Sequence, residues 1–195
     1  MMNGWQMRTQ RKDAGRMIFT VGHSVRPIEE FLGLLRANGV RRLIDIRTIP
    51  KSWRNPQFGS DALAKSLAAA GIDYIHMKNL GGLRKASRHS QNTGWRNASF
   101  RGYADYMQTE EFKAALDRAV GLAAEKPTAL MCAEAVPWKC HRSLVSDALS
   151  ARGIEVREIV SDATPHLHKV TPFARIRGSE VTYPRDSTRE LFDAG

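Results

Sequence analysis

Five short apolar stretches recur along the chain, and segments with helical periodicity separate them. The stretches cover residues 17–22, 42–46, 73–76, 128–132 and 155–160. Most of them lack polar alternation, which is typical of strands buried on both faces. Apolar residues spaced three and four apart predict helices over residues 27–38, 60–70, 110–124 and 140–152. Because strand and helix alternate, we expect an α/β fold with three layers: a mostly parallel sheet of about five strands, with helices on both faces.

The chain has 195 residues, of which 42% are hydrophobic, and this fits one domain with a packed core. We expect a disordered basic arm over residues 1–15 and a single α/β domain over residues 16–161. Residues 162–195 contain three prolines and are expected to form an extended tail packed on the domain. Residues 77–102 contain four glycines and are expected to form a long loop.

The hydropathy pattern also bears on the location of the protein. No apolar run approaches the roughly 20 residues that a membrane helix needs. The N-terminus is polar and basic and lacks the apolar stretch of a secretory signal. We therefore expect a cytoplasmic protein with no membrane partner. Two cysteines in a reducing compartment are best considered as thiols.

Polar residues follow the predicted strands at the point where each strand ends. Residues 22–24 (GHS) follow the first, Asp45 and Arg47 close the second, and Gly81 and Gly82 come after the third. Residues 132–134 (CAE) follow the fourth, and residues 161–162 (SD) follow the fifth. In open α/β sheets, ligands bind in the crevice beyond the carboxyl ends of the strands. The sequence therefore predicts a single site at this edge.

The densest group of reactive side chains lies in residues 130–142, LMCAEAVPWKCHR. A thiol between a strand end and a helix start is typical of a nucleophilic cysteine, because the helix N-terminus and nearby cations lower its pKa. Cys132 and Cys140 both fit this setting, although either thiol could instead fill the core. Arg142 is suited to bind a phosphate or carboxylate.

His23 is a second candidate for acid–base chemistry or for binding a phosphate. Gly22 before it allows close approach of another backbone segment. Asp45 and Arg47 either belong to the site or simply pair with each other. A metal site is a further possibility, since Cys132, Cys140, His23 and His141 are potential ligands, but the seven-residue gap between the cysteines is no zinc-finger spacing. A redox pair is conceivable without the usual C-x-x-C spacing.

The charge pattern favours an anionic partner. The formal net charge is +10, and Lys and Arg gain electrostatic energy against phosphates. Residues 74–104 contain six Lys and Arg and no acidic residue, interleaved with Trp95 and Phe100. Basic groups beside aromatic rings suit a nucleotide or a single-stranded nucleic acid. A solvated surface loop is the alternative.

Taken together, these motifs resemble the family catalogued as domain of unknown function 488. The resemblance rests on residues 20–24 (TVGHS), 43–47 (LIDIR), 80–82 (LGG), 131–134 (MCAE) and 140–142 (CHR), and it spans roughly residues 17–160. It implies a bacterial or archaeal α/β domain with a shared polar and cysteine-bearing motif set and no established reaction. The family pattern falls on the following positions: His23, Ser24, Asp45, Arg47, Gly81, Gly82, Cys132, Glu134, Cys140, His141 and Arg142.

The leading hypothesis is an enzyme that acts on a phosphorylated or nucleotide-like substrate. The catalytic candidates are Cys132, Cys140, His23, His141 and Glu134. The candidates for binding anions or substrate are Ser24, Asp45, Arg47, Gly81, Gly82 and Arg142. The alternatives are a non-catalytic nucleic-acid-binding module that uses loop 77–102, and a metal-binding protein that uses Cys132, Cys140 and histidines. The motifs single out no particular cofactor or oligomeric state.

Overall fold

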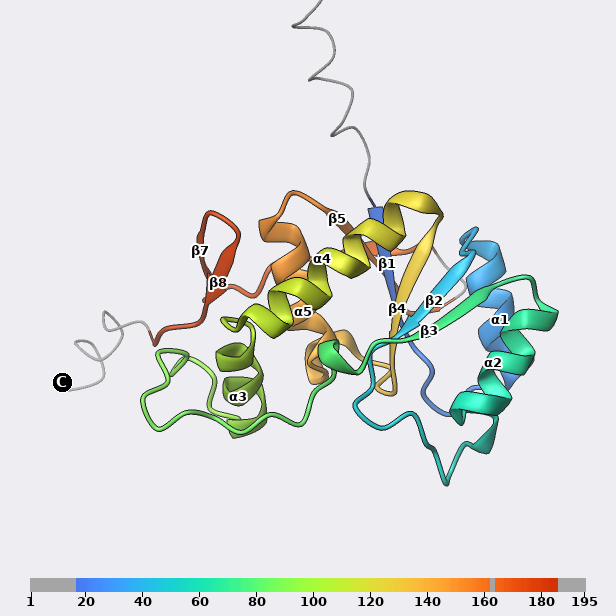
Figure 1. The fold of residues 1–195 in the computed structure, drawn as a ribbon, viewed down its shortest axis with the longest axis horizontal. Coiled ribbons are helices and arrows are strands. Elements are labelled where there is room, and N and C mark those ends of the chain that lie inside the picture. The colour runs from blue at the N-terminus through green and yellow to red at the C-terminus, as the bar shows by residue number, and fades with distance from the viewer. Residues whose placement is uncertain (1–16, 162–163, 186–195) are drawn as a thin grey trace, which may run out of the picture.

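The computed structural model describes residues 17–161 and 164–185, which form a central sheet covered by helices (Figure 1). The strands of this sheet are β1 (Met17–Gly22), β2 (Arg42–Asp45), β3 (Asp73–His76), β4 (Thr128–Cys132), β5 (Glu155–Ile159) and β6 (His166–Leu167). Their order is β3-β2-β4-β1-β5-β6, and every neighbouring pair is parallel except β5 with β6. The predicted mostly parallel sheet is therefore confirmed, with one short antiparallel strand added at its edge.

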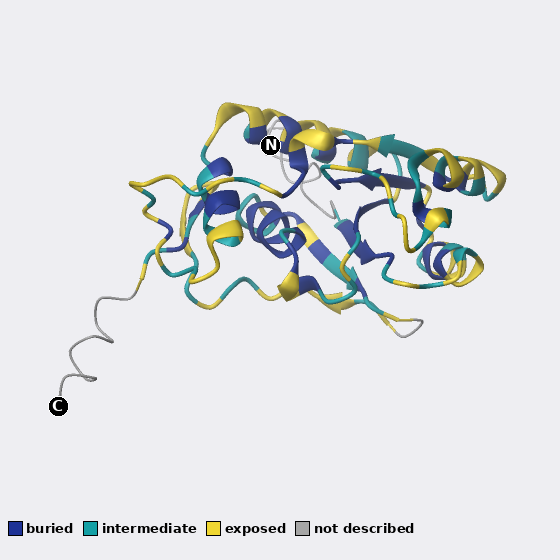
Figure 2. Ribbon diagram, turned by 90° about the horizontal axis from the view of Figure 1, so that it is seen from below, coloured by how far each residue is buried: buried dark blue, intermediate teal, exposed yellow. Residues whose placement is uncertain are grey.

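Helices cover both faces of the sheet, which confirms the predicted three layers. The helices are α1 (Ile28–Ala37), α2 (Ser60–Ala69), α3 (Ala98–Tyr106), α4 (Glu110–Glu125) and α5 (Arg142–Ala151). On one face, Phe31 of α1 and Leu67 of α2 pack with strand residues such as Val21. On the other face, α4 and α5 pack against the alternate strand residues, and Leu116 and Ile18 belong to this second core. Figure 2 shows buried strands between helices whose outer sides are exposed.

The prediction of a long loop over residues 77–102 is wrong at both ends of that segment. A short 3₁₀ helix, η2 (Lys78–Leu80), begins the segment, and α3 starts within it. The side chain of Asn97 caps α3 by accepting a hydrogen bond of 2.8 Å from the backbone N–H of Ser99. Gly102 lets α3 approach residues 84–86, since a Cβ there would lie 2.4 Å from a backbone oxygen. Tertiary packing therefore stabilises a helix with little apolar periodicity of its own.

The chain after β5 returns across the domain. Residues 175–177 (β7, Arg175–Arg177) and 180–182 (β8, Glu180–Thr182) form a separate two-stranded sheet. Val181 and Tyr183 are buried and belong to the core under α4 and α5. The expected basic arm over residues 1–15 lies outside the described residues, as do positions 162–163 and 186–195 of the expected tail.

The described residues contain no helix that is both long and apolar enough to cross a membrane. The parallel register of β1 with β4 and of β2 with β4 brings the carboxyl ends of these strands to one edge. This edge is where the polar residues of the sequence motifs follow the strands.

Candidate functional site

A pocket of about 360 Å³ lies beyond the carboxyl ends of the parallel strands. Seven of the eleven residues that the sequence singles out line it: His23, Arg47, Gly82, Cys132, Glu134, Cys140 and His141. They come from the ends of β1, β2 and β4, from the segment after η2, and from the turn before α5. The pocket thus gathers residues from positions 23 to 141, as expected for the edge of an open α/β sheet.

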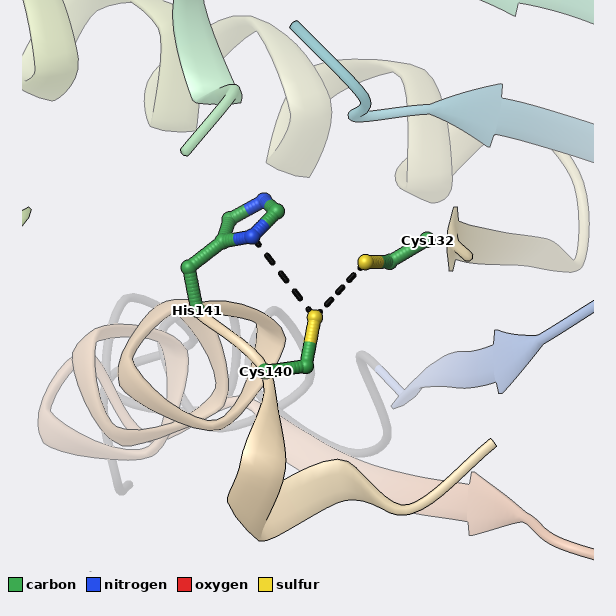
Figure 3. A group of neighbouring side chains, drawn as sticks. All are labelled: Cys132, Cys140 and His141. Carbon is green, nitrogen blue, oxygen red and sulfur yellow. Dashed lines mark hydrogen bonds between the residues drawn. The ribbon is translucent and has the colours of Figure 1, made fainter. Parts of the chain in front are cut away.

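Two buried thiols and an imidazole form the centre of the pocket (Figure 3). Cys132 ends β4, and its Sγ lies 2.6 Å from the Sγ of Cys140. The Sγ of Cys140 is in turn 3.6 Å from Nδ1 of His141. The two cysteines are 5% and 4% exposed, so what solvent access they have is through the pocket that they line.

The contacts of Cys132 favour its thiolate. The contact with Cys140 lowers its pKa most, and the nearby His141 and the backbone of Glu134 lower it further, against the opposing effect of burial. The pKa of the Cys140 thiol is raised, because it is the hydrogen-bond donor to Cys132 and is buried. The two opposite shifts favour one thiolate and one thiol in the pair, with the negative charge on Cys132.

The imidazole of His141 is positioned from two sides. Its Nε2 lies 3.3 Å from the carbonyl oxygen of Ile46, which can only accept, so Nε2 carries a proton. Nδ1 then faces Cys140 and can exchange a proton with its thiol. Gly82 lies against the ring: a Cβ at this position would be 2.9 Å from Nδ1. The His141 ring also contacts that of Tyr103, with centroids 5.0 Å apart.

Arg142 contacts the thiol centre but does not line the pocket. Its side chain is 0% exposed and donates to the carbonyl oxygens of Glu134 (3.1 Å) and Ala135 (3.3 Å). Its Nε has no hydrogen-bond partner in the described part of the chain. Its backbone N–H donates to the Sγ of Cys140 at 3.4 Å. Arg142 therefore fixes the loop after β4 and places a positive charge behind the thiols, where it lowers the pKa of Cys140 against the larger opposing effects.

The second histidine of the pocket, His23, is held in a neutral form. Arg47 donates to its Nε2 at 3.2 Å, so Nε2 is the acceptor and Nδ1–H donates to the carbonyl oxygen of Ser24 at 2.8 Å. Burial lowers the pKa of His23, and the nearby Arg47 lowers it further, against the effect of the bond to Ser24. The ring stacks on Phe58 with centroids 4.2 Å apart.

Asp45 and Arg47 pair with each other, as one of the two sequence interpretations has it. The guanidinium donates to the carboxylate at 2.6 Å and to the carbonyl oxygen of Phe58 at 2.9 Å. Tyr74 donates its hydroxyl to the same carboxylate. Asp45 is fully buried and does not line the pocket, whereas Arg47 reaches the pocket wall. The pair therefore orients His23.

Ser24 and Gly81 also lie outside the pocket lining. Ser24 donates its backbone N–H to the carbonyl oxygen of Ala133 and has a φ of 52°, which the short side chain of serine tolerates in this tight turn. Gly81 packs against Thr48, whose Oγ1 would lie 2.6 Å from an added Cβ. Gly22 is closer still to its neighbour, since its Cβ would lie 1.9 Å from the carbonyl oxygen of Glu134.

The same centre has the donor atoms of a metal site. The ligand atoms of Cys132, Cys140 and His141 lie within 4.8 Å of one another. This set of two thiols and one imidazole is one of those that hold catalytic zinc with an open position. His23, which the sequence also suggests as a ligand, is not part of this group, and its two ring nitrogens face Arg47 and Ser24.

Sequence reasoning missed several residues of the pocket. Thr48, Lys51, Phe100 and Tyr103 line it, and Lys139 lies beside Cys140 at its wall. Tyr103 belongs to α3, within a segment whose helix was not predicted, and its hydroxyl donates to the carbonyl oxygen of Leu80. Only Lys139, the basic residue beside Cys140, and Phe100, an aromatic residue of the basic segment, had a signal in the sequence.

Of the two aromatic residues of loop 77–102 singled out from the sequence, Phe100 lines the pocket and Trp95 packs against the core. Trp95 packs with Phe173 and Tyr183 at centroid distances of 4.9 and 5.4 Å. Arg84 lies over the ring of Tyr106, 3.5 Å from its centroid. Trp95 is therefore half-buried and packs against the core of the domain.

The fold and the pocket define an α/β protein with a Cys–Cys–His centre at the carboxyl edge of a parallel sheet. The family described as "Domain of unknown function DUF488" matches residues 27–149, well over half of the chain, and the chain belongs to this family. The match includes the thiol centre, whereas His23 and Ser24 precede it. Comparison with curated proteins and with solved structures gave no match.

Proposed function

We propose that this protein is an enzyme in which the thiolate of Cys132 is the nucleophile and the substrate is phosphorylated or nucleotide-like. The observation that carries the proposal is the contact of two buried thiols, 2.6 Å apart, at the wall of an open pocket and beside an imidazole. A cysteine that only fills the core is expected to have apolar neighbours. Cys132 instead lies beside a second thiol, an imidazole and backbone groups, and this favours a functional role.

The chemistry follows from the hydrogen bonds. The thiolate of Cys132 attacks an electrophilic atom of the substrate, a new bond to sulfur forms, and the bond to the leaving group breaks. The leaving group departs with its electron pair and takes the proton of Cys140. Water then breaks the bond to sulfur: its hydroxide joins the substrate and its proton returns to Cys140. His141, with Nδ1 facing Cys140, transfers protons between that thiol and the pocket.

The charges at the pocket support an anionic substrate. Lys51 and Lys139 are exposed and line the pocket, whereas Glu134 is the one acidic residue among the lining residues. Among the described residues, neither lysine takes part in a salt bridge of the structure. Arg47 and Arg142 act differently, because their guanidinium groups bond to protein oxygens and place His23 and the loop after β4.

The pH dependence of alkylation by iodoacetamide tests the nucleophile. The chain has two cysteines, so each single variant leaves one thiol. In Cys140→Ser the hydroxyl can still donate to Cys132, and we expect alkylation of Cys132 with an apparent pKa well below the free value of about 8.5. In Cys140→Ala the donor is lost, and we expect the pKa of Cys132 to rise by about one unit or more.

The matched control is Cys132→Ser, in which Cys140 is the remaining thiol and is expected to react only at high pH. If Cys132 titrates near 8.5 in both Cys140 variants, the thiolate mechanism is wrong. With a low pKa established, turnover of phosphorylated and nucleotide substrates is the next measurement, and Cys132→Ser is expected to abolish it.

A metal centre is the second candidate, favoured by the three ligand atoms within 4.8 Å of one another. Here the two cysteines and His141 would hold zinc, and Glu134, at the pocket wall, would be placed to act as a base. This candidate predicts one zinc per chain in protein purified without a histidine tag, lost in Cys132→Ala and in His141→Ala. Zinc below about one tenth of the protein concentration, with a reactive thiolate, favours the first candidate.

A further inference from the structure

Two tryptophans are exposed to solvent beside the pocket. Trp53 is 97% exposed and Trp138 is 71% exposed. Each follows or precedes a residue of the pocket wall, since Ser52 and Lys139 line it. Exposed aromatic side chains next to a pocket offer flat faces on which a ring of a ligand can stack.

Each tryptophan also borders a second depression next to the pocket. Trp53 lines one of about 370 Å³, which shares Lys51 and Ser52 with the pocket. Trp138 lines another of about 580 Å³, together with Trp95 and Phe173. The short 3₁₀ helix η3 (Pro137–Lys139) connects this depression to the pocket, because its last residue lines the pocket. Depressions therefore adjoin the pocket at two places, each with a tryptophan in its wall.

Cations stand beside both rings. Lys51 and Arg54 flank Trp53 in the sequence, and Lys139 follows Trp138; all three are exposed. The salt bridges found in residues 17–161 and 164–185 involve none of these three. The acidic residues in the walls of the pocket and of the two depressions are Glu134, Asp61 and Glu158, and Glu158 pairs with His168. With a net charge of +10, the surface suits a polyanion.

We propose that this surface binds single-stranded nucleic acid, and that the substrate of the thiol centre is a nucleotide within such a strand. The inference rests on the proposed function for the catalytic step and adds the substrate class. Bases stack on Trp53 and on Trp138, because every base has a π face and each stacked base stabilises the complex. Lys51, Arg54 and Lys139 bind the phosphates between them. One nucleotide then lies in the pocket of about 360 Å³, facing Cys132.

This surface differs from the basic loop that the sequence suggests. Trp95, the tryptophan of that loop, is half-buried and packs with Phe100, Phe173 and Tyr183. Trp53 and Trp138 are exposed, border the pocket and have cationic residues next to them in the sequence. An exposed ring on which a base can stack and a cation that can bind a phosphate are what a site for single-stranded nucleic acid needs.

Fluorescence anisotropy of a labelled oligothymidylate, and of the matching oligouridylate, tests the proposal on the full-length protein. We expect the Kd at low salt to rise by about 5- to 100-fold in Trp53→Ala and in Trp138→Ala, as for the loss of one stacked base. Ile176→Ala is the matched control: this side chain is 44% exposed on β7, and its loss is expected to leave Kd unchanged. The double variant Lys51→Gln, Lys139→Gln is expected to lower the slope of log Kd against log salt by about 1.4, for two phosphate contacts.

Several outcomes would overturn the proposal. Absence of binding by the wild type at low salt would do so, as would equal losses in the control and the tryptophan variants. Binding of thymidine monophosphate as tight as that of the oligomer would show that the strand is irrelevant. Self-association in sedimentation that disappears in Trp53→Ala or Trp138→Ala would assign the surface to a second copy of the chain.

The catalytic proposal fails separately. Cys132→Ser is expected to bind the oligomer with the Kd of the wild type, because the tryptophans and lysines are unchanged. If the oligomer binds but the pKa of the Cys132 thiol is not low, the nucleic-acid surface is supported and the nucleophile is not. If the pKa of the thiol is low but the oligomer does not bind, the nucleophile is supported and the surface is not.

Discussion

His168 connects the segment after β5 to the body of the domain, and the connection is expected to depend on pH. Its Nε2 lies 2.7 Å from Asp147 of α5, and its Nδ1 lies 2.8 Å from Glu158 of β5. Its side chain is 4% exposed, and Asp147 is fully buried and also accepts from the hydroxyl of Tyr183 and the backbone N–H of Thr171. Burial alone would lower the pKa of His168, but the two carboxylates outweigh it and raise the pKa to about 9.

The sign of the effect on stability follows from this direction. A raised pKa means that the folded state binds the proton more tightly than the unfolded chain, whose histidine has a pKa of about 6.5. The stabilisation is therefore complete below about pH 6.5 and is lost as the pH rises through about 9. A difference of about 2.5 pKa units corresponds to about 3 kcal/mol at pH 6, about 1.4 kcal/mol at pH 8 and almost nothing at pH 10.

Urea unfolding of the wild type and of His168→Gln, followed at pH 6, 8 and 10, measures this contribution. The variant removes the titrating group, so other groups that titrate over this range cancel in the difference. We expect the gap in the free energy of unfolding between the two proteins to shrink by about 3 kcal/mol from pH 6 to pH 10. A gap that stays constant over this range would mean that His168 is neutral in the folded protein and that the reasoning is wrong.

Substitutions of Gly22 and Gly82 give further predictions about the site, and Gly121 of α4 is the control. Gly22→Ala places a Cβ 1.9 Å from the carbonyl oxygen of Glu134, and we expect it to lower the free energy of unfolding by more than about 3 kcal/mol in urea. Gly121→Ala, where the added methyl meets open space in α4, is expected to stabilise by up to about 1 kcal/mol. Gly82→Ala meets Nδ1 of His141 at 2.9 Å, so we expect an altered pH profile of Cys132 alkylation with a change in unfolding free energy below about 2 kcal/mol.

The sequence predicts most of the fold because its strands and four of its helices are marked by local signals. Buried apolar runs mark the strands, and α1 shows acidic residues in its first turn and Gly39 with φ 67° after its end. α3 lacks such signals: Gly102 lies in its middle, and packing against residues 84–86 decides its conformation. β6, β7 and β8 are two or three residues long and have no periodicity to detect.

The rule that ligands bind at the carboxyl ends of parallel strands places seven of eleven predicted residues at the pocket, because strand ends can be read from local sequence. The other features of the site depend on contacts between residues that are far apart in the sequence. No sequence signal indicates that Tyr103 lies beside His141, or that Tyr74 donates to Asp45 beside Arg47. The exposure of Trp53 and Trp138 likewise depends on how two loops pack. Only the tertiary structure shows that Trp53 and Trp138 are exposed whereas Trp95 packs against the core.

The burial of Arg142 argues that the thiol centre is negatively charged. A guanidinium that is 0% exposed is costly unless an anion compensates it, because burial removes its hydration. Its hydrogen bonds go to two carbonyl oxygens, and the salt bridges of the described residues include none from it. The thiol pair is the neighbour that its charge acts on, because Arg142 lowers the pKa of Cys140 and donates its backbone N–H to the Sγ of that residue. The buried charge of Arg142 therefore favours a thiolate in the pair, while its hydrogen bonds to the two carbonyl oxygens offset part of the cost of its burial.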